Sequence, residues 1–191
     1  QTDHLFRLVG RLVAPIWHRA KAVTAVSRFV AGLAAKAYGV EPIVVPNGVR
    51  LVAAPRLSIL SRGRILMVGR LSIQKNPLLA IRALALIREM DWSLDVIGDG
   101  PLRTEMEALA RHEGIADRVT VHGWLSEAQV AERMAESDIL LLTSLQEGLP
   151  MVAIEAPQWG LAIVSSRIGG VHDIVDEGKN GFLCELTAAA F

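Results

Sequence analysis

The stretch 138–155, DILLLTSLQEGLPMVAIE, carries the strongest structural signal in the chain. Residues 138–142 form an apolar run of the kind expected for a buried strand of a parallel sheet. A Gly-Leu-Pro turn follows, and Pro150 suits the first position of a helix, where its missing N–H has no helical partner. A strand, a loop and a helix in this order predict one βα unit of an α/β fold.

Two glutamates, Glu147 and Glu155, bracket the start of the predicted helix. The backbone N–H groups of Met151 and Val152 have no partners within that helix, so they can point at an anion in front of it. A carboxylate accepts hydrogen bonds from neighbouring hydroxyls, which a sugar or a ribose offers. The pattern therefore favours a ligand with both hydroxyls and negative charge, although two acidic residues can also flank an ordinary helix.

A second apolar strand, 64–68, ends in Gly69 and Arg70, and Lys75 follows five residues later. A guanidinium and an ammonium together can neutralise a diphosphate, while a glycine lets the backbone approach it closely. The alternative is that Arg70 and Lys75 are solvated loop charges. Their position after a strand favours the first interpretation, because open α/β sheets bind ligands at the carboxyl ends of their strands.

The segment 95–102, DVIGDGPL, predicts another strand followed by a tight glycine turn. A dinucleotide-binding Gly-x-Gly-x-x-Gly motif is not supported, because Arg103 occupies the third glycine position. Further along the chain, 118–125 (RVTVHGWL) predicts a short strand that ends at Gly123, and 162–170 predicts a strand that leads into Gly169 and Gly170.

These motifs, in this order, resemble the Glu-x7-Glu and Gly-Arg-Leu signatures of retaining glycosyltransferases with the GT-B fold, of the group 1 or family 4 type. The resemblance implies that Arg70, Lys75 and Glu147 are catalytic, that Glu147 holds the donor sugar, and that Glu155 holds the ribose. The implied donor-binding residues are Gly69, Arg70, Lys75, Gly123, Trp124, Glu147, Gly148, Leu149, Met151, Val152 and Glu155. For Trp124 itself we favour a packing role over a contact with the base.

The resemblance implies a nucleotide-diphosphate-sugar as co-substrate and no metal, because two cations and a helix end replace one. The sequence contains no Asp-x-Asp motif and no cluster with zinc spacing. The chain departs from the family around Pro157, which should shorten or kink the signature helix.

Strands and helices alternate from Gly63 onward, which predicts an α/β, Rossmann-like parallel sheet with helices on both faces. The expected elements, in chain order, are 64–68, 77–90, 93–97, 102–113, 119–121, 126–136, 138–142, 150–159, 162–165, 171–176 and 181–183. We divide the chain into a remnant of a GT-B N-terminal domain (1–46), a linker (47–62) and a nucleotide-sugar-binding domain (63–191).

The remnant is predicted to contain helices at 4–20 and 28–38, the second capped by Ser27, and strands at 22–26 and 43–46. A single short strand lacks most of the sheet that it would join. We therefore expect residues 1–45 to leave apolar surface uncovered or to self-associate, and we interpret the chain as a piece of a longer protein.

The 191 residues are 51% hydrophobic and carry no formal net charge, which allows one sizeable core and gives no general attraction to nucleic acid. No apolar run reaches the roughly 18 residues of a membrane span. The single cysteine, Cys184, excludes an internal disulfide framework and is typical of the cytoplasm. We expect a cytoplasmic protein, at the inner membrane face in its full-length form if membrane-associated.

Together these observations predict the donor-binding part of a nucleotide-sugar-dependent, retaining glycosyltransferase, with no activity of its own. The acceptor, a glycan, lipid or small molecule, would bind to the missing N-terminal half. One alternative is a non-catalytic nucleotide-sugar-binding module, and another is a GT-B protein similar to sugar-nucleotide epimerases. A glycosidase pair formed by Glu147 and Glu155 would leave Arg70 and Lys75 unexplained.

Overall fold

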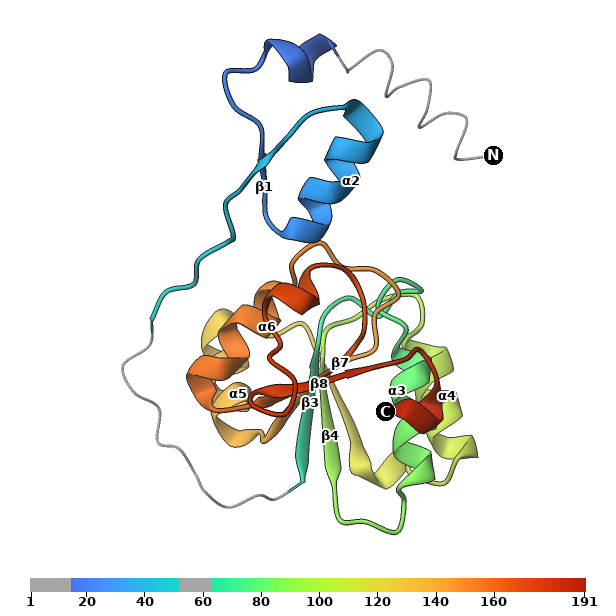
Figure 1. Ribbon diagram of the computed structural model, residues 1–191. Helices are drawn as coiled ribbons and strands as arrows, with labels where there is room; N and C mark the ends of the chain where they lie inside the picture. The colour runs from blue at the N-terminus through green and yellow to red at the C-terminus, as the bar shows by residue number, and fades with distance from the viewer. Residues whose placement is uncertain (1–14, 52–62) are drawn as a thin grey trace. The chain divides into compact units, whose positions relative to one another are not determined.

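The computed structural model describes residues 15–51 and 63–191 (Figure 1). Contacts divide the chain into unit 1, Gln1–Gly48, and unit 2, Val49–Phe191. None of the helices among the described residues combines the length and the apolar character needed to cross a membrane.

Unit 2 contains a six-stranded sheet in which all neighbouring strands are parallel, in the order β5-β4-β3-β6-β7-β8. The predicted α/β fold is therefore confirmed. The strands are β3 (Arg64–Val68), β4 (Ser93–Ile97), β5 (Val119–Gly123), β6 (Ile139–Leu142), β7 (Ala162–Ser166) and β8 (Gly181–Cys184).

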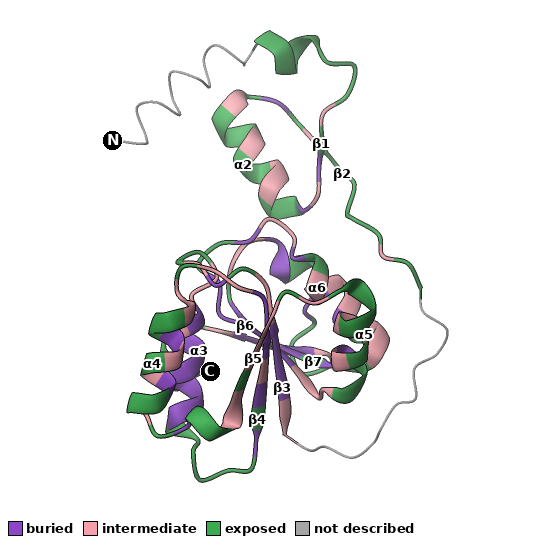
Figure 2. Cartoon of the chain, turned by 180° about the vertical axis from the view of Figure 1, so that it is seen from behind, coloured by how far each residue is buried: buried purple, intermediate pink, exposed green. Residues whose placement is uncertain are grey.

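Helices cover both faces of this sheet, as Figures 1 and 2 show. The helices α3 (Pro77–Leu86) and α4 (Arg103–His112) lie on one face, and α5 (Glu127–Glu136) and α6 (Met151–Glu155) lie on the other. A hydrophobic core lies on each face of the sheet, and alternate residues of β3 point into opposite cores. Ile65 and Met67 pack toward α3, while Leu66 packs with Met134 of α5. Short 3₁₀ turns complete the unit at Ala116–Arg118, Ala156–Trp159, Gly169–Asp173 and Ala188–Ala190.

The order of the strands reverses between β3 and β6. From β3 the chain proceeds to β4 and β5 on one side, and it then returns to β6, β7 and β8 on the other. In open parallel sheets such a reversal leaves a crevice at the carboxyl ends of the two strands. The loops that follow β3 and β6 are therefore the first places to look for a ligand site.

Several helix boundaries differ from the sequence prediction, each for a local reason. The helix predicted for 77–90 ends at Leu86, where Arg88 Nε donates to Ala85 O at 2.9 Å and Trp92 Nε1 donates to Ile87 O at 3.0 Å. These side-chain contacts satisfy carbonyls that a longer helix would have used.

The predicted helix 150–159 begins one residue later than expected, because Pro150 is the N-cap of α6. It ends at Glu155 and continues only as the 3₁₀ turn Ala156–Trp159. Pro157 shortens the helix as predicted, since it has no N–H to donate back along it. The segment predicted at 171–176 is the 3₁₀ turn Gly169–Asp173.

Unit 1 contains a parallel pair of two-residue strands, β1 (Thr24–Ala25) and β2 (Ile43–Val44), joined through α2 (Arg28–Tyr38). Ser27 caps α2 by accepting a hydrogen bond from Val30 N at 3.2 Å, as predicted. Both strands are shorter than expected. Of the helix predicted for 4–20, residues 15–19 are helical, and the remainder lies outside the described residues.

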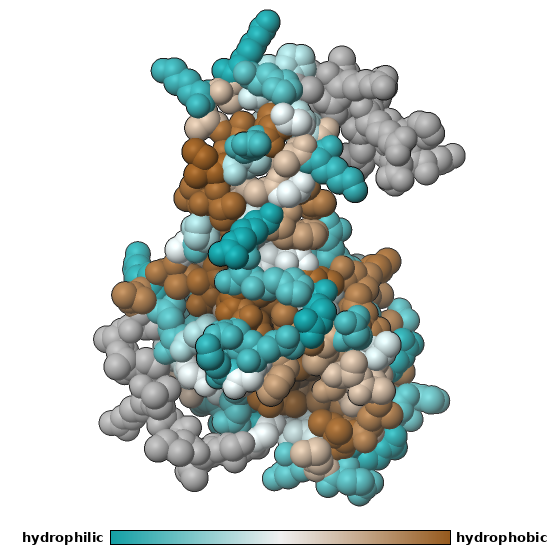
Figure 3. All heavy atoms as spheres, in the orientation of Figure 1, coloured by the Kyte–Doolittle hydropathy of each residue, from teal (hydrophilic) through white to brown (hydrophobic). Residues whose placement is uncertain are grey.

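No residue of α2 is buried. Large apolar side chains of unit 1 are exposed, as expected, and Figure 3 shows hydrophobic atoms gathered on the surface of this unit. These residues include Phe29, Leu33, Ile43, Val44 and Val45. The predicted self-association through this surface stays a prediction.

Candidate functional site at the carboxyl ends of β3 and β6

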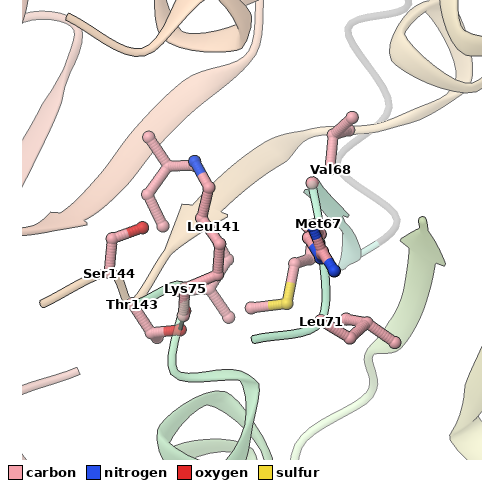
Figure 4. Close-up of a pocket in the computed structure, with 10 residues that line it drawn as sticks. Met67, Val68, Leu71, Lys75, Leu141, Thr143 and Ser144 are labelled. Atoms are coloured by element: carbon pink, nitrogen blue, oxygen red, sulfur yellow. Dashed lines mark hydrogen bonds between the residues drawn. The ribbon is translucent and has the colours of Figure 1, made fainter. Parts of the chain in front are cut away.

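A pocket lies at the carboxyl ends of β3 and β6, where the strand order reverses. Figure 4 shows Lys75, Thr143 and Ser144 on one side of this pocket and Met67 and Leu71 on the other. The residues that line it are Met67, Val68, Gly69, Arg70, Leu71, Lys75, Leu141, Leu142, Thr143 and Ser144. Of the predicted site residues, Gly69, Arg70 and Lys75 line this pocket, whereas Glu147, Glu155 and the other predicted residues do not.

Lys75 and Glu147 meet beside this pocket. Lys75 Nζ donates to Glu147 Oε1 at 2.5 Å, and only 7% of the Glu147 residue is exposed. The aliphatic part of Lys75 passes over Gly69, where an added Cβ would lie 3.4 Å from Lys75 Cε. The predicted cation and the predicted acid thus lie at the same edge of the sheet, and Gly69 makes room for the lysine.

Further hydrogen bonds join the two loops that carry Lys75 and Glu147. Leu145 N donates to Gln74 O at 2.7 Å, and Gln74 Nε2 donates to Gln146 O at 3.0 Å. The loop after β3 also contains Asn76, whose φ of 48° places it in the left-handed region. These contacts hold a strained turn in place, so the separation of Lys75 and Glu147 is fixed by backbone as well as by charge.

The backbone of Glu147 is held from behind by the glycine loop after β7. Gly170 N donates to Glu147 O at 3.3 Å. A Cβ at Gly169 would lie only 1.8 Å from Glu147 O, and the φ of Gly169 is 52°. Only glycine fits here without displacing the Glu147 backbone.

Arg70 lines the same pocket but is exposed. Within the described part of the chain its side chain makes no hydrogen bond or ion pair. A guanidinium with five donors and no protein acceptor is well suited to bind an anion that enters the pocket.

Glu155 is the last residue of α6 and is half-buried. Burial, and to a smaller extent the Glu127 carboxylate, raises the pKa of Glu155. Its side chain forms no hydrogen bond with the residues that the structure describes. A carboxylate that is partly desolvated and lacks a cationic partner is a candidate binding group.

The other predicted site residues near α6 are Gly148, Leu149, Met151 and Val152, and their role as donor contacts stays a prediction. Gly148 and Leu149 are half-buried in the loop, and Met151 and Val152 open α6. Ala153 N donates to Pro150 O at 3.0 Å, so the N–H groups of Met151 and Val152 precede the first bond of the helix.

Gly123 and Trp124 lie at the carboxyl end of β5. Gly98 N donates to Gly123 O at 2.7 Å, which ties the ends of β4 and β5 together. Trp124 is 67% exposed, so the packing role favoured from the sequence is wrong for this side chain. The side chain ends in solvent because β5 is the edge strand of the sheet and the loop leaves it directly.

The glycines of the Gly-Asp-Gly-Pro turn have a structural role. A Cβ at Gly98 would lie 2.0 Å from Gly69 O, and one at Gly100 would lie 2.4 Å from Leu71 O. The two loops therefore approach each other at their backbones. This close packing of backbones accounts for Gly98 and Gly100, so a dinucleotide-binding role is not needed to explain them.

Sequence reasoning missed three hydroxyl residues of the site, Thr143, Ser144 and Ser166, all of which are buried. A signal was present, because Thr143 and Ser144 directly follow the apolar residues of β6 at its carboxyl end. Arg103, which interrupts the glycine motif, bridges Asp99 and Glu107 at 3.0 Å each. Among the described residues, no group of three or more His, Cys, Asp or Glu side chains is placed to hold a metal.

The fold is a Rossmann-like domain whose candidate site lies where the strand order reverses. A family model described as "Glycosyl transferases group 1" matches residues 56–190, which is well over half of the chain. The chain therefore belongs to the group 1 glycosyl transferase family.

Individual relatives agree with this assignment. The chain is 33% identical over 160 residues to the UDP-Gal:alpha-D-GlcNAc-diphosphoundecaprenol alpha-1,3-galactosyltransferase of Escherichia coli, a match that covers 75% of this chain and 41% of the relative. It is 35% identical over 101 residues to the N-acetyl-alpha-D-glucosaminyl L-malate synthase of Bacillus anthracis, covering 53% of this chain and 26% of that enzyme.

Among solved structures, the apo form of the lipopolysaccharide outer core galactosyltransferase WaaB has a TM-score of 0.76 at 32% identity, with 89% of this chain and 50% of that chain covered. The structure of Anabaena Alr3699/HepE in complex with UDP has a TM-score of 0.86 at 23% identity, with 100% and 57% covered, and this likeness shows the fold. The chain thus spans about half or less of the length of these relatives.

Proposed function

We propose that this chain binds the donor of a retaining glycosyltransferase that uses nucleotide-diphosphate sugars. The observation that carries the proposal is the contact between Lys75 and Glu147 beside the pocket where the strand order reverses. A cation for the diphosphate and a carboxylate for the sugar hydroxyls then lie side by side, as a ligand with phosphate joined directly to sugar requires.

Arg70 and Lys75 would bind the diphosphate of the donor. During transfer the bond between the anomeric carbon and the phosphate oxygen breaks, and the nucleoside diphosphate leaves with the electron pair. The acceptor hydroxyl oxygen bonds to the anomeric carbon, and its proton passes to the departing diphosphate oxygen. Two cations held at the leaving oxygen stabilise the developing charge, and removal of one such contact typically costs ~3 kcal/mol of barrier, about a hundredfold in rate.

Glu147 would hold the hydroxyls of the donor sugar, and Glu155 would hold the ribose. The loop at Gly123 and Trp124 would lie against the base, and the exposure of Trp124 supports this role. Gly148, Leu149, Met151 and Val152 would line the passage between sugar and phosphate. These assignments, and retention of configuration, extend the family resemblance to the residues that match its motifs.

The name of the Escherichia coli relative contains UDP-Gal, so a uridine nucleotide is the first donor to test. We propose that the two cations make a metal unnecessary for donor binding, and that the protein works in the cytoplasm, at the inner membrane face if its acceptor is a lipid. The acceptor would bind outside this donor site.

The alternative is a module that binds nucleotide sugars without transferring them. Both proposals share the donor site, and they differ in whether the donor turns over.

Calorimetry with UDP and UDP-galactose, followed by an assay of donor turnover, tests both. Binding without transfer or hydrolysis supports the module, and transfer supports the enzyme. We expect Arg70→Ala and Lys75→Ala each to weaken binding of UDP by ~1.5–3 kcal/mol, the value of a hydrogen bond to a charged group. Unchanged dissociation constants in both variants would mean that the diphosphate binds elsewhere. Binding that survives EDTA would agree with a metal-free site.

A further inference from the structure

Buried polar side chains of unit 2 are concentrated at one place. Apart from Glu147, the buried polar residues that the structure describes in this unit are Thr143, Ser144, Ser165 and Ser166, at the carboxyl ends of β6 and β7. Burying a hydroxyl costs free energy unless it is hydrogen-bonded, so the acceptors of these hydroxyls indicate what each one holds in place.

Two of these hydroxyls hold the segment that bears Glu147, one by a bond to the Ser144 backbone and one by a bond to the Glu147 carboxylate. Ser166 Oγ donates to Ser144 O at 2.6 Å, and Ser144 Oγ donates to Glu147 Oε1 at 2.7 Å. Ser144 and Ser166 are 2% and 0% exposed, so water does not compete strongly for these bonds. The first bond links the end of β7 to the backbone that follows β6, and the second links that segment to the acid.

Thr143 holds the loop that follows β3 through hydrogen bonds to its backbone. Its Oγ1 lies 2.9 Å from Asn76 O and 3.2 Å from Lys75 O, so its one proton is shared between two carbonyls. These are the carbonyls of the left-handed residue Asn76 and of the lysine that contacts Glu147. Thr143 and Ser144, which directly follow β6, therefore have complementary roles. Thr143 holds the loop that carries Lys75, and Ser144 holds the side chain of Glu147.

The two hydrogen bonds on the Glu147 carboxylate both fall on Oε1, one from Lys75 and one from Ser144. From the described residues Oε2 accepts none. If a diphosphate draws the Lys75 ammonium away, as the proposed function requires, the buried carboxylate keeps Ser144 as its donor. A buried carboxylate with no donor at all would be strongly destabilised.

We propose that Ser144 is a positioning residue, supported by Ser166, that keeps Glu147 aimed at the donor sugar when Lys75 turns to the diphosphate. The inference rests on the proposed function, because it assigns the sugar to Glu147. Oε1 stays on Ser144, and Oε2 accepts a hydroxyl of the sugar. Ser144 lines the pocket, but its one hydroxyl proton is donated to Glu147 Oε1, so in this proposal it acts through the carboxylate.

The first test compares UDP with UDP-galactose by calorimetry on the whole chain. Ser144→Ala should weaken UDP-galactose about tenfold, the effect of one hydrogen bond to a charged group, and leave UDP within about twofold of the parent chain. Ser166→Ala should also weaken UDP-galactose more than UDP, but by a smaller factor than Ser144→Ala. Ser165→Ala is the matched control, because Ser165 is equally buried and donates only to Ser166 O at 3.1 Å.

An equal loss for UDP and UDP-galactose would show that Ser144 merely supports the fold, and no loss for either would also overturn the inference. If the parent chain binds neither ligand, the proposed function fails, and a second test addresses Ser144 without a ligand.

In that test Lys75→Met mimics withdrawal of the ammonium, and urea unfolding follows the four combinations of Lys75→Met with Ser144→Ala. Ser144→Ala should reduce the folding equilibrium constant at least about fivefold more in the Lys75→Met background than alone, because Glu147 then loses its last donor. Additive effects would overturn the inference. The variant that combines Lys75→Met with Ser144→Ala could fail to fold while the one that combines Lys75→Met with Ser165→Ala folds. That outcome would also support the inference.

Discussion

The two halves of the candidate site are built in opposite ways. In the interlocked half, Lys75, Thr143, Ser144, Glu147 and Ser166 satisfy one another through hydrogen bonds. In the open half, Arg70, Trp124 and Glu155 make no hydrogen bond or ion pair with side chains of the described residues, and Trp124 is 67% exposed. The contrast suggests that one half is preorganised by the protein and that the other is completed by the ligand.

The difference has consequences for stability as well as for binding. Changes in the interlocked half should lower the stability of the fold and the affinity for a donor together. Changes in the open half should lower the affinity for a donor with little effect on stability, because groups without protein partners contribute little to folding.

The largest effect is expected at Gly169, which supports the interlocked half from behind. Gly169→Ala should destabilise unit 2 by about 2–5 kcal/mol, because the new methyl group meets the Glu147 carbonyl and the residue is left-handed. An added Cβ would lie 1.8 Å from Glu147 O at a φ of 52°. Urea unfolding measures the loss.

The matched control is Gly178→Ala, at a φ of 78° with no atom within 4 Å of the added Cβ. It should cost only the conformational part, about 1–2 kcal/mol. Equal losses at the two glycines would mean that the backbone of Glu147 is free to move, and the site would then not be held from behind.

The next comparison sets the two cations against each other. Lys75→Met should lower stability by about 1–2 kcal/mol, less than for a fully buried pair, because 27% of the lysine side chain is exposed while Glu147 is left buried without it. Arg70→Met should stay within about 0.5 kcal/mol of the parent. Thermal unfolding and UDP calorimetry on the same samples separate the two effects.

Both variants should bind UDP more weakly, so affinity alone does not distinguish them. A stability loss in Arg70→Met as large as in Lys75→Met would contradict the division of the site into an interlocked and an open half.

The sequence was sufficient for part of this picture. The apolar runs before Gly69 and before Thr143 predicted parallel strands, and parallel strands bring their carboxyl ends to one edge, so Lys75 and Glu147 were expected there. The ion pair itself was not predictable, because it depends on how two loops 72 residues apart in sequence fit together.

Other details escaped prediction for the same reason. The left-handed Asn76 is held by Thr143 from a distant strand, and α3 ends at Leu86 because Arg88 and Trp92 satisfy carbonyls near its end. Periodicity marks which residues face a core, but it does not report side chains that arrive from elsewhere to replace helix bonds or to hold a turn.

A pH-dependent effect is expected at Glu155. Its pKa is raised by burial and by Glu127, so the folded state binds the proton more tightly than the unfolded chain does. Protonated Glu155 therefore contributes stability. This contribution is fully present below the pKa of the unfolded chain, about 4.3, and it is lost as pH rises through the pKa of the folded protein. Glu155→Gln should therefore raise the melting temperature at pH 7.

This gain should shrink as pH is lowered toward 4, about where the unfolded carboxyl titrates. Melting curves from pH 4 to pH 8 follow it. Glu132→Gln, an exposed change on α5, is the control. A gain for Glu155→Gln that is constant across this range would mean that its charge is compensated in the folded protein.

The smallest effect on stability is expected at Trp124. Trp124→Ala should change the free energy of unfolding by no more than about 0.5 kcal/mol, because the side chain is 67% exposed. The matched control is Trp92→Ala in the core of unit 2, where the tryptophan is 5% exposed, and it should cost about 3–5 kcal/mol. Urea unfolding compares the two. A loss at Trp124 near that at Trp92 would restore the packing role, whereas unchanged stability with weaker UDP binding would place Trp124 in the open half, against the base.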